Sequence, residues 1–127
     1  MYAAGTPHPN KEPSVTFLEQ VAIGEVDALI DAEVLQEILH RYRAINRWQD
    51  GRRVYDHARQ IVPHVVPITA EMLDDARALL DMYGDLTARD ALHAAVYRSI
   101  EATALCSYDQ DFDAIKGINR REPPHFL

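Results

Sequence analysis

Short apolar segments alternate with amphipathic helical segments along this chain, and that alternation favours one class of fold. Strands are expected at residues 25–30, 65–68 and 103–106, where apolar residues lie between Gly, Pro and acidic residues. Apolar residues recur at helical spacing before and between these segments. Strands that are separated by helices usually pair in parallel within one sheet. The sequence therefore predicts an α/β fold with a parallel sheet.

Five helices are expected, and capping residues mark several of their ends. Asp31, Thr69 and Thr87 each precede a helix and can accept a hydrogen bond from its first turn. Pro13 suits the first position of the opening helix, because its missing N–H would be unpaired there. The expected helices run from Pro13 to before Gly24, from Asp31 through Tyr42, and over 46–62, 70–83 and 88–100. The tail from Pro123 has no helix signal.

Length and composition restrict the class of protein. The chain has 127 residues, 47% of them hydrophobic, which is enough for one domain with one core over residues 1–127. The lone Cys106 can form no internal disulfide and no Cys-based zinc site. The chain contains no apolar run of membrane-spanning length and no signal-peptide pattern at its start. We therefore expect a cytoplasmic protein.

The basic residues are concentrated in one stretch of an acidic chain. The formal net charge is −7, yet six of the 13 basic residues are arginines between residues 41 and 59. They are Arg41, Arg43, Arg47, Arg52, Arg53 and Arg59, and only Asp50 and Asp56 oppose them there. Such a stretch is either a contact for a polyanion or a solvated helical face, and the sequence leaves both open.

Three acidic positions are not explained by simple helix amphipathicity. Glu37 lies at the edge of an apolar stripe, although an i,i+4 ion pair with Arg41 would also account for it. Asp90 opens a helix rich in alanine, which suggests close packing around a carboxylate that needs a partner. Favourable interaction with the helix dipole is the simpler explanation of Asp90.

The third acidic feature is the turn 107–113, which follows the last expected strand. Asp109, Asp111 and Asp113 alternate there, but Ala114 and Arg120 stand where a calcium loop of the EF-hand type needs Gly and Glu. Parallel sheets bind ligands beyond the carboxyl ends of their strands. Carboxylates that converge at such an end would form an oxygen-ligand site for Mg²⁺ or Mn²⁺.

Two other kinds of site are considered. Glu37 with His40, and Asp90 with His93, have the acid-x-x-His spacing of helical di-metal proteins. That arrangement needs further inward acids, which the helix at 70–83 does not offer in a clean stripe, and His40 should face solvent. Nucleophilic catalysis by Cys106 has little support, since a lone cysteine in an apolar strand is usually an inert core residue.

Three motifs taken in order, at residues 32–38, 86–94 and 107–112, resemble the PIN-domain ribonucleases, in particular the VapC-like toxins of bacterial toxin–antitoxin pairs. The resemblance extends from Tyr2 to about Arg120. It implies a three-layer α/β/α fold with a short parallel sheet, a homodimer, and cleavage of RNA with Mg²⁺ or Mn²⁺. It also implies a cognate antitoxin protein that masks the site.

The resemblance assigns roles to individual residues. Glu37, Asp90 and Asp109 would hold the metal and form the catalytic site, with Asp111 or Asp113 as an outer-shell helper. A fourth family acid, in an Asp-x-Asn motif ending the opening central strand, has no counterpart, so Met1 is interpreted as an internal methionine of a longer reading frame.

Activity and contacts follow from these assignments as expectations. Arg41, Arg52 and Arg53 would contact RNA phosphates, from a helical hairpin whose basic side adjoins the acidic pocket. With one acid absent, cleavage by this chain should be feeble. The alternatives are a catalytically impaired PIN-like protein that binds RNA or antitoxin, and a structural helical domain whose acids are caps and ion pairs.

Overall fold

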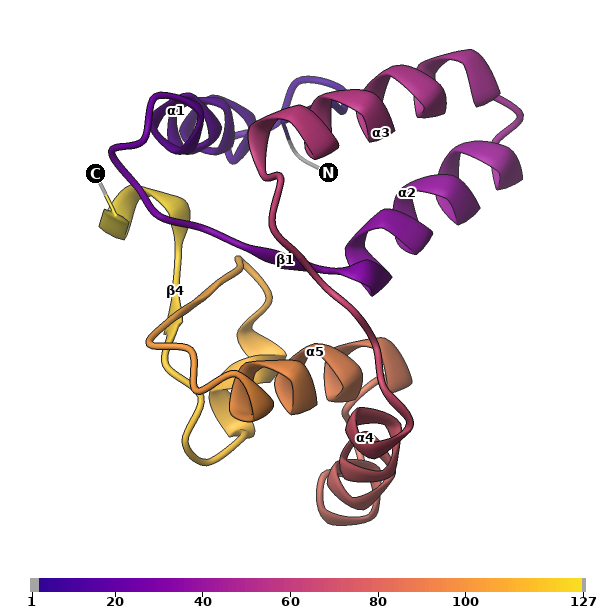
Figure 1. Ribbon diagram of the computed structural model, residues 1–127, viewed down its shortest axis with the longest axis vertical. Coiled ribbons are helices and arrows are strands. Elements are labelled where there is room, and N and C mark those ends of the chain that lie inside the picture. Colours follow the sequence, from indigo (N-terminus) through magenta and orange to yellow (C-terminus); the bar gives the residue numbers. More distant parts are fainter. Residues whose placement is uncertain (1–2, 127) are drawn as a thin grey trace. The chain divides into compact units, whose positions relative to one another are not determined.

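The computed structural model describes residues 3–126, and the chain forms two compact units (Figure 1). Unit 1 comprises Met1–Val66 together with Phe126–Leu127, and unit 2 comprises Pro67–His125. Each unit combines α-helices with one pair of short parallel strands. The α/β class with parallel strand pairing is therefore confirmed.

Unit 1 is built around the strand pair β1–β2 and a helical hairpin. Its elements are α1 (Lys11–Ala22), β1 (Ile30–Asp31), α2 (Ala32–Ala44), α3 (Trp48–Ile61) and β2 (Val65–Val66). Ile30 pairs with Val65 and Asp31 with Val66. Leu35, Ile38 and Tyr42 on α2 are buried against apolar residues of α3, β1 and β2. This packing matches the apolar stripe that the sequence predicts for α2.

The turn between α2 and α3 lets the two helices approach closely. Asn46 has a φ of 61°, a left-handed conformation that asparagine tolerates better than most residues. On α3, a Cβ placed at Gly51 would lie 2.5 Å from the Cβ of Tyr42. Only glycine fits at that crossing. The arginine-rich stretch therefore belongs to a tightly packed hairpin, as the sequence predicts.

Unit 2 packs two helices together and carries the second strand pair. Its elements are α4 (Ala70–Met82), α5 (Ala88–Ser99), β3 (Leu105–Cys106), η1 (Gln110–Ala114), β4 (Arg120–Arg121) and η2 (Pro123–Phe126), whose last residue belongs to unit 1. Leu105 pairs with Arg120 and Cys106 with Arg121. Ala91, Ala94 and Ala95 on α5 have no exposed surface, which confirms the close packing that the alanine-rich sequence predicts.

Helix starts are predicted well. Asp31 accepts a hydrogen bond from the Val34 amide at 3.1 Å, and Thr69 and Thr87 cap α4 and α5 in the same way. Pro13, by contrast, is the third residue of α1 and not the first, because the helix already begins at Lys11.

The strands and the tail need correction. The strand expected over 25–30 is wrong except at its last residue, and the segments 65–68 and 103–106 contribute only two paired residues each. Strands exist only where a neighbouring strand supplies hydrogen bonds, which propensity does not encode. The sequence does not predict the strand β4. The tail from Pro123 forms the short 3₁₀ helix η2 instead of an irregular end.

No helix among residues 3–126 is both long and apolar enough to span a membrane.

Candidate functional site

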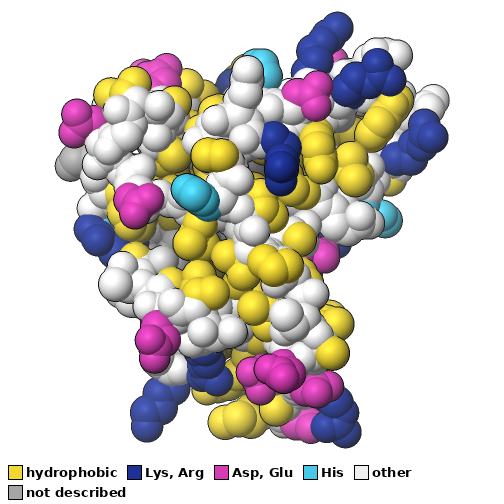
Figure 2. Space-filling model, in the orientation of Figure 1, with side chains coloured by type: hydrophobic (Ala, Val, Ile, Leu, Met, Phe, Trp, Pro, Cys, Tyr) yellow, Lys and Arg dark blue, Asp and Glu magenta, His cyan; other side chains and the backbone are white. Residues whose placement is uncertain are grey.

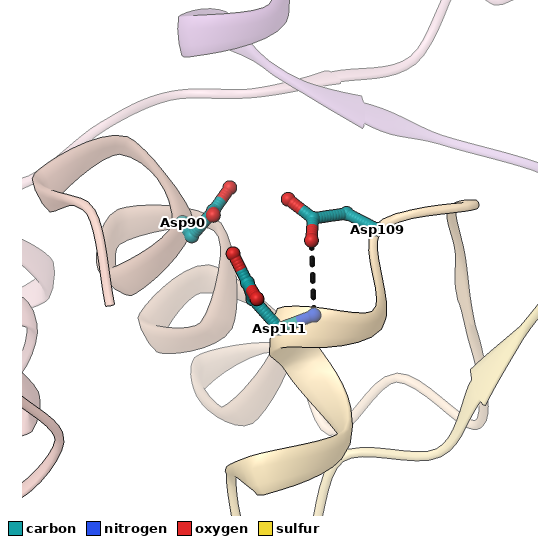
Figure 3. A group of neighbouring side chains, drawn as sticks. All are labelled: Asp90, Asp109 and Asp111. Atoms are coloured by element: carbon teal, nitrogen blue, oxygen red, sulfur yellow. Dashed lines mark hydrogen bonds between the residues drawn. The ribbon is translucent and has the colours of Figure 1, made fainter. Parts of the chain in front are cut away.

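Three aspartates of unit 2 converge on one point, although they come from two separate elements. Asp90 lies in the first turn of α5, Asp109 precedes η1, and Asp111 lies within η1. One carboxylate oxygen of each lies within 4.8 Å of the others, and Figure 3 shows the three side chains directed toward a common space. We call these three residues the aspartate cluster. Asp111 also lines a hollow of about 270 Å³ beside the turn between α4 and α5.

Local hydrogen bonds fix the backbone that carries Asp109 and Asp111. The Asp109 amide donates to the Ser107 hydroxyl at 3.0 Å, and the Asp111 amide donates to Asp109 Oδ1 at 2.9 Å, the dashed line in Figure 3. Asp109 thereby caps η1 with one of its two carboxylate oxygens. The chain reaches this turn directly from β3, so the strand end sets its position.

Asp90 is the most buried member of the aspartate cluster. Its amide donates to the Thr87 hydroxyl at 3.1 Å, which is the cap contact expected of Thr87. Burial raises the pKa of the Asp90 carboxyl, and the nearby charge of Asp109 raises it further. Both effects disfavour the anion until a positive charge arrives. The electrostatics of the cluster therefore favour cation binding.

The donor set suits a hard divalent cation. All the donors are carboxylate oxygens, which Mg²⁺ and Mn²⁺ prefer, and the group includes no histidine or cysteine. Two oxygens bound to one Mg²⁺ are at most about 4.2 Å apart, since each bond is about 2.1 Å. The 4.8 Å spread is slightly wider than that, so binding such an ion would require a small movement of at least one carboxylate. The residues present therefore fit such an ion.

Asp113 is not part of the aspartate cluster, because Arg120 holds it. Arg120 Nε donates to Asp113 Oδ1 at 2.8 Å, and Nη2 donates to Oδ2 at 3.2 Å. The hydrogen bonds and positive charge of Arg120 lower the pKa of the Asp113 carboxyl. Of the two candidate helpers, Asp111 thus joins the cluster and Asp113 forms an ion pair.

One arginine of the hairpin, Arg43, lines a shallow apolar hollow of about 480 Å³. It is lined by Gln36, Leu39, His40, Arg43, Ala44 and Trp48. The Arg43 guanidinium lies 5.5 Å from the centre of a Trp48 ring, within range of a cation–π contact. Dark-blue and yellow side chains gather over this end of α2 and α3 at the upper right of Figure 2. The hairpin therefore offers both positive charge and an aromatic surface.

Comparison with known proteins identifies the family. The PIN domain family model matches residues 1–118. This chain belongs to the PIN domain family. It is 42% identical over 120 residues to VapC ribonuclease Mb1869c of Mycobacterium bovis and to ribonuclease VapC13 of Mycobacterium tuberculosis. Each match covers 94% of this chain and 92% of the relative, which makes it a VapC-like PIN protein. No solved structure gives a significant match.

Glu37, the third acid that the PIN resemblance assigns to the site, lies on α2 in unit 1 and is half-buried. This agrees with its expected place at the edge of the apolar stripe. The alternative ion pair with Arg41 is not formed, since Arg41 has no ion pair within residues 3–126. The participation of Glu37 in a PIN metal site stays a prediction.

The competing kinds of site gain no support from the geometry. His40 is exposed, and the acidic group that could hold a metal within residues 3–126 consists of aspartates alone. Residue Cys106 is exposed, so the expectation of a core cysteine is wrong. Desolvation of its thiol raises the pKa to about 11, which leaves little thiolate for nucleophilic attack at neutral pH.

Arg120 is the residue of this region that sequence reasoning missed. Its position served only to exclude a calcium loop, although it holds both ends of the acidic turn. The available sequence signal was an arginine a few residues after three alternating acids, and spacing does not reveal which acid it contacts.

Proposed function

We propose that this protein is a metal-dependent endoribonuclease toxin of a toxin–antitoxin system. Glu37, Asp90 and Asp109 would hold Mg²⁺ or Mn²⁺, with Asp111 as a helper. The observation that carries the proposal is the aspartate cluster, whose oxygen-only donors lie within 4.8 Å of one another. Two VapC ribonucleases at 42% identity support the choice of RNA as substrate.

The residues of the chain prepare the site for phosphodiester hydrolysis. When bound, a divalent cation activates water and stabilises negative charge at the phosphate. Asp109, with one oxygen fixed by the Asp111 amide, presents its other oxygen in a defined direction. Asp90, half-buried in the first turn of α5, supplies a carboxylate that gains most from an added positive charge. Asp113 takes no direct part, since Arg120 engages both its oxygens.

The arginines of the hairpin would bind the RNA backbone. Arg41 and Arg52 are exposed and form no ion pair within residues 3–126, whereas Arg47 and Arg53 both contact Asp50. Unpaired guanidinium groups are the better phosphate ligands, because no partner must be released first. Arg41, Arg52 and Arg53 are proposed as RNA contacts, with Arg53 contributing less than Arg52.

The proposed partners follow the family. Residues 1–127 would act as a single PIN-like domain and as a homodimer in the cytoplasm, and a cognate antitoxin protein would mask the site. Exposed apolar residues on α4, namely Leu73, Leu80 and Met82, offer surface for a protein contact. Light scattering on the purified chain measures the mass, and a monomer at micromolar concentration would refute the dimer.

The central test replaces one cluster residue by its uncharged isostere. Asp109→Asn should lower Mn²⁺ affinity and reduce cleavage of a labelled RNA at least tenfold, because a bound carboxylate is lost. Asp74→Asn on the exposed face of α4 is the matched control and should leave both unchanged. Cleavage that persists in EDTA, or that survives Asp109→Asn undiminished, would refute the proposal.

The same assay separates the binding-only alternative. A PIN-like protein that binds RNA without cutting would retain the labelled RNA in a mobility shift, while the RNA stays intact with saturating Mn²⁺. A wild-type chain that binds neither Mn²⁺ nor RNA would favour the alternative of a structural domain whose acids are helix caps and ion pairs.

Glu37 has its own test. Glu37→Gln should weaken Mn²⁺ binding if its carboxylate joins the metal set, and Glu33→Gln, one turn earlier on α2, controls for the loss of charge. Equal Mn²⁺ affinity in the two variants would remove Glu37 from the proposed site without affecting the aspartates of unit 2.

A further inference from the structure

One guanidinium joins the two ends of the segment that carries Asp109 and Asp111. Arg120 Nη1 donates to the Ser107 carbonyl at 3.1 Å, two residues before Asp109. Its Nε donates to Oδ1 of Asp113 at 2.8 Å, and its Nη2 donates to Oδ2 at 3.2 Å. Asp113 lies two residues after Asp111. The segment 107–113 is thereby closed into a loop whose ends share one anchor.

The anchor itself is held by the strand pair. Arg120 belongs to β4 and pairs with Leu105 of β3, the strand from which the segment departs. The Ser107 amide donates to the Arg121 carbonyl at 3.1 Å, which ties the start of the segment to the same strand. The Arg120 side chain is only 14% exposed, and Nη1 also lies 3.4 Å from Glu122 Oε2. The Asp113 side chain is 55% exposed, so the bidentate pair contributes mainly direction and less energy than a buried pair would.

The Arg120–Asp113 contact also separates Asp113 from the two other acids of the segment, Asp109 and Asp111. Three carboxylates in five residues repel one another, and any of them could turn toward the cation site. The Arg120 guanidinium neutralises Asp113 and turns it toward β4. Asp109 and Asp111 remain to face Asp90, which is the arrangement in Figure 3.

We propose that Arg120 is a positioning residue, which holds the segment 107–113 in its cation-binding geometry by bridging Ser107 and Asp113. This inference rests on the proposed metal-dependent function. Arg120 lies two residues beyond the segment that the family model matches, whereas Ser107 and Asp113 lie within it.

The test measures cation affinity and local motion instead of cleavage. Manganese EPR gives the Mn²⁺ affinity of the full chain, and hydrogen exchange without metal reports the opening of residues 107–113. Arg120→Gln should weaken Mn²⁺ binding about tenfold, as losses of outer-shell support typically do, and should speed exchange across the segment. Arg120→Lys, which keeps the charge but not the bidentate geometry, should fall between this variant and the wild type.

The matched control is Arg98→Gln in the same unit. Arg98 donates to the Lys116 carbonyl at 2.8 Å, so its loss removes a similar guanidinium-to-backbone contact outside the segment. This variant should bind Mn²⁺ as the wild type does. If Arg120 served stability alone, thermal melting would shift while Mn²⁺ affinity and exchange of the segment stayed unchanged, and the inference would be wrong.

A double-mutant cycle shows whether Arg120 acts through Asp113. Asp113→Asn should weaken Mn²⁺ binding less than Arg120→Gln does, because the Ser107 contact survives it. Adding it to Arg120→Gln should cause little further loss, since the shared contact is already gone. Additive losses would contradict the bridge. A wild-type chain that binds no Mn²⁺ would refute the proposed metal site, whereas hydrogen exchange would still decide the role of Arg120.

Discussion

In each unit an aspartate at or just after the end of a strand caps the helix that follows, but the two aspartates have different surroundings. In unit 1, Asp31 at the end of β1 is buried and caps the long helix α2. In unit 2, Asp109 after β3 is exposed and caps only the short η1. Asp31 stabilises a long helix, whereas Asp109 lies close to the carboxylates of Asp90 and Asp111. An aspartate after a strand therefore reports function only when its surroundings bring further acids to the same point.

Charge separates the units as well. Unit 1 holds the six arginines of the 41–59 stretch, and unit 2 holds the aspartate cluster. Under the proposed function the arginines contact the RNA backbone and the aspartate cluster holds the metal. Substitutions of the arginines should therefore change RNA binding, and those in the aspartate cluster should change metal binding, whereas Glu37 is the unit 1 residue proposed to join the metal set.

The largest effect on stability is expected at Gly51 in unit 1. Gly51→Ala would place a methyl group 2.5 Å from the Tyr42 Cβ, which is too rigid to move away. The hairpin must separate, at a cost of about 1–3 kcal/mol or more. Denaturant unfolding measures it. Gly84→Ala in unit 2 is the control, because nothing lies within 4 Å of the added atom. Equal stability of the two variants would show that the hairpin is not closely packed.

RNA affinity should respond next, and only to the arginines of unit 1. Arg52→Ala combined with Arg53→Ala should weaken binding of single-stranded RNA about tenfold and lower the salt slope by between roughly 0.7 and 1.4, since each full phosphate contact contributes about 0.7 and Arg53 contributes less than Arg52. Trp48 is the only tryptophan in the chain, so its fluorescence reports binding at the hairpin in EDTA. Arg77→Ala on α4 is the control. An unchanged salt slope would show that these arginines do not contact phosphates and only form a solvated helical face.

The two aspartates that end strands provide a smaller and more direct contrast. Asp31→Ala removes the cap of α2 and should destabilise the metal-free protein by about 1 kcal/mol. Asp109→Ala removes a weaker cap but also relieves repulsion within the aspartate cluster, so its cost should be smaller. Thermal melting in EDTA compares them. A larger loss from Asp109→Ala would mean that the acidic turn contributes more to folding than to ligand binding.

Sequence reasoning succeeds here where the cause is local. Asp31, Thr69 and Thr87 reveal helix starts because a cap bonds to residues within its own first turn. The convergence of Asp90 with Asp109 follows less directly, from the rule that ligands gather at strand ends. These features need no knowledge of distant partners.

The features that the sequence predicts wrongly or leaves open concern contacts between distant residues. The strand expected over 25–30 has only one paired residue, because pairing depends on β2, about 35 residues away. The choice of Asp111 over Asp113 depends on Arg120, seven residues further along a non-helical path. The spacing of residues along the sequence predicts neither of these contacts. The place of Glu37 in the site likewise depends on packing beyond its own helix.

The smallest expected effect is the pH dependence of Asp90. Burial and the charge of Asp109 hold the pKa of the Asp90 carboxyl in the folded protein above that of an aspartate in the unfolded chain, so between the two pKa values the folded state keeps a proton that the unfolded chain has released. Stability in EDTA therefore falls as pH rises through that window, and the penalty persists above it. Asp90→Asn cannot ionise, so its melting temperature relative to wild type should rise from pH 3 to pH 7. With Mn²⁺ the order should reverse at pH 7, because the wild type then gains a ligand-bound state that the variant lacks. A difference that stays flat with pH in EDTA would show that Asp90 pays no electrostatic penalty in the cluster, and the site would lose its preference for a cation.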